Sequence, residues 1–367
     1  KYTMKQVKIS LFILLLLAVG ISSCRGKKQT KVGTTANLPR VEVSARLNDS
    51  IIHLLTEAEA DSMDIHSIMV VQGGNIIFEN WMNEGDASKP HILNSVSKTF
   101  TSIAIGIAIN EGKIKLSDKL ISFFPTQLPS NISDNLAAIT VRDLLTMTCG
   151  HAIDHTYEMQ RLAKEYPSMD WIKCFLNYPV EFKPGEVYCY NSVGTFMLSA
   201  IIQKATGEKL IDYLNTRLFI PLQIENAYWT ENSQGINYGG WGLYLKTEDL
   251  AKVGQLLLQE GKWNGKQLIS KGWITEMSKK QVDSAPAGIN TTQLIQTTAD
   301  PDWVQGYGYQ MWRCRNNAFR ADGAMGQYIL ILPDQNAVVV MTANTHKMQK
   351  ELELVWKYIL PVLNNLK

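Results

Sequence analysis

Strand-like segments lie at both ends of this chain and a long helical stretch separates them, which is the feature that most restricts its fold. Residues 67–80, "SIMVVQGGNIIFEN", contain two β-rich runs around Gly73-Gly74 and predict a hairpin. Strand-like runs return at 307–344, whereas residues 113–235 have mostly helical patterns. We therefore expect an α/β fold of the α+β kind, in which both ends of the chain build one antiparallel sheet, helices pack on it, and the helical block is an insertion.

The first 23 residues predict an export signal. Lys5 and Lys8 precede an apolar run at 9–21 that is too short to cross a membrane comfortably. The run ends in "ISSC", which resembles the bacterial lipobox and implies lipid attachment at Cys24. An ordinary signal peptide with an incidental cysteine is the alternative.

Three regions follow from this interpretation. We expect a signal peptide at 1–23, a lipidated flexible tether at 24–40 and a single domain at 41–367. The lipid would hold the protein at a membrane of the bacterial cell envelope, facing the periplasm or the cell surface.

Charge and cysteine content exclude some classes of partner. Cleavage after residue 23 removes three lysines, so the formal charge falls from +2 to 2 − 3 = −1. No basic cluster remains to suggest nucleic-acid binding. The spacing of the four remaining cysteines fits no metal motif and no disulfide framework, so we expect four small buried hydrophobic residues: Cys149, Cys174, Cys189 and Cys314.

The segment "NSVSKTF" at 94–100 contains the strongest candidate for catalysis. It opens an almost wholly apolar helix, predicted from about Ser95 to Asn110, so Lys98 is expected in a buried first turn. Burial and the positive end of the helix dipole both lower the pKa of a lysine. Because residues i and i+3 share a helix face, a neutral Lys98 amine beside Ser95 suits a general base that activates a serine nucleophile. The Ser95 backbone N–H would face the oxyanion, although the S-x-x-K pattern alone is common.

Several segments together resemble one known superfamily. "NSVSKTFTSIAIGIAINEGKIKLSD", "TVRDLLTMTCG", "FKPGEVYCYNSVGTFML" and "GYGYQMWRCRNNAFRADGAMGQYILILP" are similar to the penicillin-recognising serine hydrolases. This superfamily includes class C β-lactamases, DD-peptidases, related esterases and 6-aminohexanoate-dimer hydrolase. The resemblance covers about residues 45–365, and it implies the β-lactamase/DD-peptidase fold.

The resemblance also assigns a second motif. The family's Tyr-x-Asn falls on Tyr190-Asn191-Ser192, so Ser192 replaces the usual Asn and is an expected substrate contact. Tyr190 would relay the proton to the leaving group. Tyr188 is the rival assignment, and core packing is the structural alternative for either tyrosine.

The third motif departs from the family's Lys-Thr-Gly. It falls on Ala321-Asp322-Gly323, so the cation and hydroxyl that help to hold a substrate carboxylate are missing. The resemblance implies that Asp322 and Gly323 line the substrate site and that the Ala324 N–H is the second oxyanion donor. Alternatively, Asp322 only pairs with Arg320, its same-face neighbour.

One other stretch could suggest metal chemistry. "HAIDH" places His151 and His155 four residues apart, with Asp154 between them. No third ligand is evident, so we expect a loop at the cleft mouth rather than a metal site.

These features predict a serine hydrolase that acts on a small or peptide-like amide or ester through an acyl-enzyme, without a cofactor or metal. The alternatives are a true β-lactamase or DD-peptidase, and an envelope lipoprotein that has lost turnover. The sequence does not indicate an oligomeric state.

Overall fold

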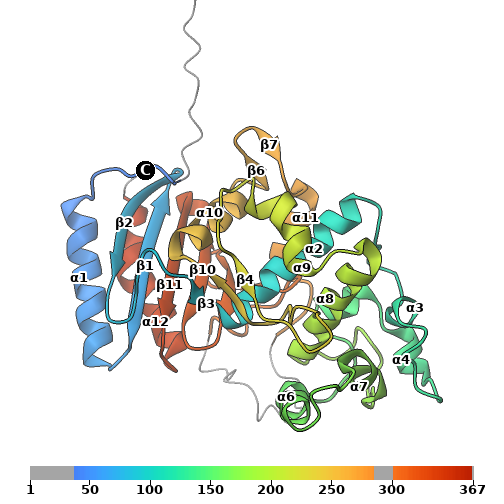
Figure 1. Cartoon of the computed structure of the whole chain (residues 1–367). Helices are drawn as coiled ribbons and strands as arrows, with labels where there is room; N and C mark the ends of the chain where they lie inside the picture. Colours follow the sequence, from blue (N-terminus) through green and yellow to red (C-terminus); the bar gives the residue numbers. More distant parts are fainter. Residues whose placement is uncertain (1–36, 285–300, 366–367) are drawn as a thin grey trace, which may run out of the picture. The chain divides into compact units, whose positions relative to one another are not determined.

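The computed structural model describes residues 37–284 and 301–365 (Figure 1). The predicted signal peptide, Cys24 and most of the predicted tether therefore lie outside the described residues. The end of the stretch assigned to the tether contacts the folded body instead. Leu38 is buried, and Arg40 forms ion pairs with Glu79 and Glu248, each at 2.9 Å. Their packing shows that the ordered body begins earlier than position 41.

A six-stranded antiparallel sheet combines both ends of the chain, as predicted, in the order β2-β1-β11-β10-β9-β8. The expected hairpin around Gly73-Gly74 is formed by the first two strands. The strands are β1 (Ile65–Gln72), β2 (Asn75–Trp81), β8 (Trp312–Arg313), β9 (Phe319–Gly323), β10 (Gln327–Leu332) and β11 (Ala337–Ala343).

Helices cover both faces of this sheet, which explains why its central strands are apolar almost throughout. Alternate side chains of one strand enter two separate cores: Val339 packs on one face and Val340 on the other. The first face is covered by α1 (Ala45–Ala60), α12 (Met348–Leu354), the π-helical turn η4 (Val355–Ile359) and α13 (Leu360–Leu363). The second face is covered by α2 (Ser97–Asn110) and α10 (Thr247–Leu258).

Short helices dominate the segment between the two halves of the sheet, and in Figure 1 several of them gather beyond α8, away from the strands. The helical elements of this segment are α3 (Leu120–Phe123), α4 (Asp134–Ala138), α5 (Val141–Leu145), α6 (Thr156–Glu165), α7 (Trp171–Asn177), the longer α8 (Ser192–Thr206), α9 (Leu210–Leu214) and the π-helical turn η2 (Asn215–Phe219).

The remaining elements are short. A small sheet has the order β3-β5-β4, from β3 (His91–Ile92), β4 (Tyr228–Trp229) and β5 (Leu243–Leu245). A hairpin joins β6 (Lys262–Trp263) to β7 (Lys266–Gln267), and α11 (Lys271–Ser278) follows it. The 3-10 turns are η1 (Asn94–Val96) and η3 (Pro333–Gln335).

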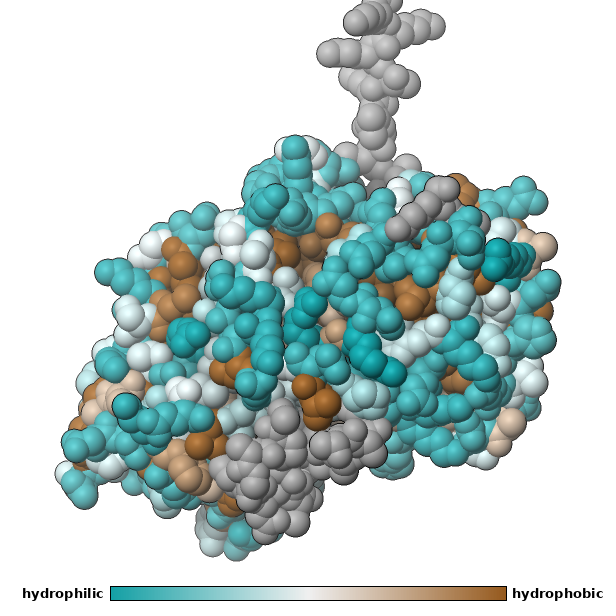
Figure 2. Space-filling model, turned by 180° about the vertical axis from the view of Figure 1, so that it is seen from behind, coloured by the Kyte–Doolittle hydropathy of each residue, from teal (hydrophilic) through white to brown (hydrophobic). Residues whose placement is uncertain are grey.

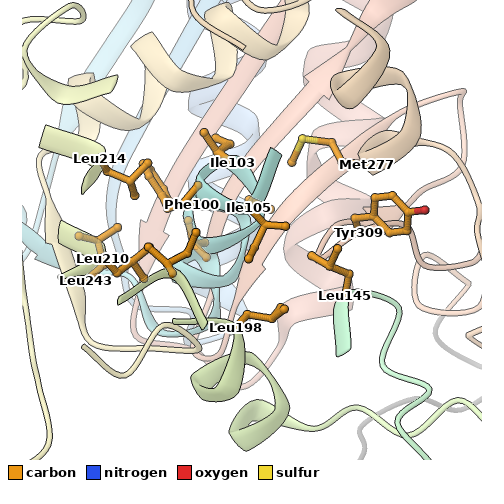
Figure 3. Packing of buried hydrophobic residues seen from close by; sticks show 14 of the residues in the cluster. Phe100, Ile103, Ile105, Leu145, Leu198, Leu210, Leu214, Leu243, Met277 and Tyr309 are labelled. Atoms are coloured by element: carbon orange, nitrogen blue, oxygen red, sulfur yellow. The ribbon is translucent and has the colours of Figure 1, made fainter. Parts of the chain in front are cut away.

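Helix α2 lies at the centre of the larger core. Every residue from Ser97 to Ala108 is buried. Figure 3 shows Phe100, Ile103 and Ile105 of this helix among side chains from many other segments. These neighbours are Leu145, Leu198, Leu210, Leu214, Leu243, Met277 and Tyr309. The helix is therefore enclosed on all sides, as its apolar sequence predicts.

The face of the molecule in Figure 2 is mostly hydrophilic, with small separate hydrophobic patches. Within the described part of the chain, the helices are all too short or too polar to traverse a bilayer.

Candidate active site

The backbone of the small sheet places Ser95. Leu93 N–H donates to the Leu243 carbonyl at 2.9 Å, and Leu243 N–H donates to Ser97 Oγ at 3.2 Å. The predicted helix does not begin as an α-helix at Ser95: a 3-10 turn holds this residue, and α2 follows from Ser97. Ser97 is occupied by a backbone contact in the core, so its hydroxyl is directed away from the Ser95 site.

Lys98 is the hub of the site. Its side chain is 1% exposed, and its Nζ donates to Ser95 Oγ at 2.8 Å, to Ser192 Oγ at 3.1 Å and to the Gly240 carbonyl at 2.9 Å. All three acceptors are neutral. No salt bridge therefore holds the ammonium form in place among these contacts.

The surroundings of Lys98 favour the neutral amine. Burial lowers the pKa of Lys98 from 10.5 to about 7, against the opposing effects of Asp154 and Asp322. At neutral pH a large fraction of this side chain is therefore unprotonated. A neutral amine 2.8 Å from a serine hydroxyl can accept its proton.

Tyr190, rather than Tyr188, reaches this pair. The Tyr190 ring centroid lies 4.7 Å from Lys98 Nζ, and an interaction with the Ser95 side chain slightly opposes the rise in the pKa of Tyr190. Burial raises the pKa of Tyr190 well above its ordinary value, so the side chain is a neutral phenol. Tyr188 instead packs its ring against Tyr307, with centroids 5.6 Å apart.

The N-terminus of α8 brings the second motif to Lys98. Asn191 caps this helix by accepting a hydrogen bond from Gly194 N–H at 3.0 Å. Ser192, expected to contact substrate, is 9% exposed and accepts a hydrogen bond from Lys98. Its contact in this structure is with the lysine amine.

The third motif lies directly against the Ser95 turn. A Cβ atom at Gly323 would lie 2.3 Å from the Leu93 carbonyl oxygen, so only glycine permits this approach of β9. Asp322 is 6% exposed, and Arg320 Nε donates to its Oδ2 at 2.6 Å. The alternative of an Arg320–Asp322 pair is thus what the structure contains.

The Gly240 carbonyl is a site group that sequence reasoning missed. A Cβ atom at Gly240 would lie 2.8 Å from the Ser192 carbonyl oxygen and 3.6 Å from Lys98 Nζ, so a side chain would crowd the amine. The glycine-rich run "YGGWG" at 238–242 indicated a close backbone approach, but not its partner.

The "HAIDH" histidines have other partners. His151 Nδ1 lies 3.2 Å from Cys149 Sγ, and His155 Nδ1 lies 3.0 Å from Glu158 Oε2. Burial lowers the pKa of His151 to about 4. In the described ranges, no group of three or more His, Cys, Asp or Glu side chains is arranged to hold a metal ion.

The four cysteines within the described residues are unpaired, and the expectation that all of them are buried is wrong for two. Cys149 and Cys314 are buried, whereas Cys174 and Cys189 are partly exposed. Both partly exposed residues lie in the short-helix region, where small elements cover their neighbours incompletely.

Comparison with known proteins extends over most of the chain. The family model described as Beta-lactamase matches residues 56–364. The 6-aminohexanoate-dimer hydrolase of Paenarthrobacter ureafaciens is 23% identical over 288 residues, which cover 75% of this chain and 71% of that protein.

Solved structures agree with this match. A Bacillus anthracis protein described as a candidate 6-aminohexanoate-dimer hydrolase has a TM-score of 0.72 at 22% identity, covering 90% of this chain and 87% of that one. A D-stereospecific amidohydrolase from Streptomyces sp. has a TM-score of 0.64 at 17% identity, covering 85% and 98%. At these identities the structural likeness concerns the fold alone.

Proposed function

Because this chain belongs to the β-lactamase family, a family of hydrolases, we propose that it is a serine hydrolase that cleaves an amide or ester through an acyl-enzyme. The observation that carries the proposal is the 2.8 Å contact between Lys98 Nζ and Ser95 Oγ, with the amine buried and its pKa near 7. A lysine placed in this way has no evident structural purpose, because burying an ammonium group costs free energy.

Each group has a proposed role in acylation. Ser95 Oγ attacks the carbonyl carbon while its proton passes to Lys98 Nζ. The Ser95 and Ala324 N–H groups stabilise the oxyanion. The neutral Tyr190 phenol donates a proton to the leaving oxygen or nitrogen and is reprotonated at the expense of the lysine ammonium. Water then releases the acyl group from Ser95.

The third motif favours neutral esters and amides over substrates that carry a carboxylate beside the scissile bond, such as β-lactams and D-Ala-D-Ala peptides. Ala321 and Asp322 provide neither a cation nor a hydroxyl for a substrate carboxylate, and Arg320 is committed to Asp322. Asp322 and Gly323 therefore shape the site beside β9 more than they bind charge.

A covalent serine probe tests the proposal. We expect a fluorophosphonate to form one adduct, and mass spectrometry of the labelled peptide should place it on Ser95. The Ser95→Ala variant is the matched control and should remain unlabelled. An adduct on Ser97, or hydrolysis of an ester without any adduct, would refute the mechanism.

We also propose that Cys24 carries a lipid that holds the enzyme at the cell envelope. The support is the order of basic residues, apolar run and "ISSC" in the sequence. This placement would expose the site to substrates outside the cytoplasm.

A further inference from the structure

We infer that Asn94 is a positioning residue that sets the geometry of the oxyanion site, by tying the turn that carries Ser95 to the loop that carries Ala324. The inference rests on the proposed function, because it concerns the same reaction. Its basis is a contact between segments far apart in sequence: Asn94 Nδ2 donates to the Ala324 carbonyl at 2.7 Å. Asn94 directly precedes Ser95, whose N–H is one proposed oxyanion donor, and Ala324 carries the other proposed donor on its own N–H.

The backbone at position 94 restricts which residues can make this contact. Asn94 has a φ of +46°, in the left-handed region that asparagine, aspartate and glycine tolerate best. It starts the 3-10 turn η1, so its conformation also sets the direction in which Ser95 leaves the small sheet. Among these three residue types, only asparagine adds an N–H donor.

The facing loop is held from a second direction. Ala324 O also accepts a hydrogen bond from Gln327 Nε2 at 3.2 Å. The Gln327 amide is buried and anchored to the end of β11, donating to Ala343 O at 2.8 Å and accepting from Ala343 N–H at 3.2 Å. Gln327 thus fixes the loop to the sheet, and Asn94 fixes the Ser95 turn to the loop.

Neighbouring contacts leave the loop little freedom. Met325 and Gly326 both have positive φ, at +70° and +90°, and the Met325 carbonyl accepts a hydrogen bond from Thr345 N–H at 3.1 Å. At the other end, Gly323 lies directly against the Leu93 carbonyl oxygen. Two contacts therefore join the Ser95 turn to the loop: the close approach of Gly323 to Leu93, and the hydrogen bond from Asn94 to Ala324. Together they set the distance between the two proposed oxyanion donors, the N–H groups of Ser95 and Ala324.

Loss of the Asn94–Ala324 hydrogen bond should affect catalysis more than the stability of the fold. The Asn94 contact is exposed to solvent, so its loss should change stability little. Loss of one oxyanion donor typically lowers kcat by about 10²- to 10³-fold, because the donor acts mainly in the transition state. Displacing a donor without removing it should lower kcat by an amount at the lower end of that range or below it.

Asn94→Asp tests the inference with the smallest change. Aspartate keeps the shape and tolerates the left-handed backbone, but it replaces the N–H donor by an oxygen that faces the Ala324 carbonyl. We expect kcat for a neutral p-nitrophenyl ester to fall about 10- to 100-fold, with KM within about threefold. The midpoint of thermal unfolding should fall by no more than about 5 °C.

Two further variants make the result specific. Asn94→Gly keeps the backbone conformation without adding charge, and we expect the same loss of kcat while the pH at which kcat/KM is half-maximal stays near 7. The matched control is Asn75→Asp in the β1–β2 hairpin, where the side-chain amide donates to the Gly73 carbonyl at 3.2 Å. The strand register places Asn75 at the end of the sheet opposite to Gly323. We expect its kcat to remain within twofold of wild type.

These experiments distinguish failure of the Asn94 inference from failure of the proposed serine hydrolase function. A wild-type protein that no serine probe labels would overturn the proposed function, and this inference with it. Labelled wild type with unchanged kcat in both Asn94 variants would overturn the inference alone. A loss confined to KM would also overturn it, since Asn94 would then bind substrate directly.

Discussion

Arg320 Nε donates to Asp322 Oδ2 at 2.6 Å, and both side chains are buried within β9. Arg320 also donates through Nη1 to the Asp302 carbonyl and stacks over the Trp303 ring, 4.6 Å from its centroid. Burial raises the pKa of Asp322 to about 6, although Arg320 opposes that rise. The third motif therefore contains a compensated ion pair, and neither partner offers a free charge to substrate.

This pairing leads to a prediction about substrate charge. We expect kcat/KM for a neutral ester to exceed that for its matched carboxylate analogue by about tenfold or more. A charge-assisted hydrogen bond contributes about 1.5–3 kcal/mol, and each ~1.4 kcal/mol of lost transition-state binding is tenfold in rate. Steady-state kinetics on the two substrates provide the measurement.

A substitution that restores a hydroxyl should narrow that difference. Asp322→Thr alone would leave Arg320 buried without its partner, at a cost of about 3–5 kcal/mol in the free energy of unfolding. The double variant Arg320→Met/Asp322→Thr avoids an unpaired buried charge and is the better test. Efficient hydrolysis of the cephalosporin nitrocefin by wild type, equal to that of neutral esters, would instead support a β-lactamase.

The pKa of Lys98 predicts the pH dependence of acylation. Because burial lowers this pKa to about 7, the neutral base is depleted below pH 7 and dominates above it. We expect kcat/KM to fall about tenfold per pH unit below 7 and to level off above it. A profile that is flat between pH 5 and 7 would argue against Lys98 as the base.

The same shift predicts a change in stability with pH. The ordinary pKa of lysine is 10.5, so between pH 7 and 10.5 the unfolded chain binds a proton at Lys98 that the folded protein does not. The free energy of unfolding should therefore rise with pH across this window, relative to Lys98→Met. Denaturant titrations of both proteins at several pH values would measure the difference.

Retaining the positive charge at position 98 should not retain activity. Lys98→Arg places a guanidinium beside Ser95, and this group does not deprotonate in the working range. We expect acylation to slow by on the order of 10³-fold or more, as measured by the rate of probe labelling. Labelling of this variant at the wild-type rate would assign the base to another group, with Tyr190 the first to test.

Cys24 provides a prediction about anchoring. If it is the lipid attachment site, Cys24→Ser should abolish incorporation of an alkyne fatty acid and leave the signal peptide uncleaved or misprocessed. Cys174→Ser is a suitable control, because this partly exposed cysteine lies in the folded body. Equal label in Cys24→Ser and wild type would show that the lipobox interpretation is wrong.

Local sequence patterns were sufficient for much of the fold and for the Ser95–Lys98 pair. Strand alternation and turn residues predicted the sheet from both chain ends, and the i, i+3 spacing predicted one shared helix face. The match of Tyr190 came from a family resemblance, and the structure places its ring beside Lys98.

The remaining site contacts have no local signature. Gly240 lies 142 residues from Lys98 and Asn94 lies 230 residues from Ala324, so only tertiary packing brings each pair together. Helix α1 was also not predicted, although its buried residues recur at helical spacing: Leu47, Ile51, Leu54 and Ala58. The Arg320–Asp322 pair remained one of two alternatives from the sequence. Strand spacing shows that the two residues share a face, but not whether their side chains bond to each other or face the substrate site.

The pairing of β1 with β11 has a consequence for when activity arises during biosynthesis. β11 ends at Ala343, so β1, which lies between β2 and β11 in the sheet, lacks one of its two neighbours until residue 343 has been synthesised. Ser95 likewise emerges from the ribosome long before Ala324, its proposed partner in oxyanion stabilisation. Pairings this distant in sequence form slowly, because the chain must close a long loop before the contacts stabilise it. A nascent chain, or one truncated before Ala343, would therefore contain the proposed nucleophile Ser95 and the proposed base Lys98 without an assembled site, which restricts the proposed reaction to the folded domain.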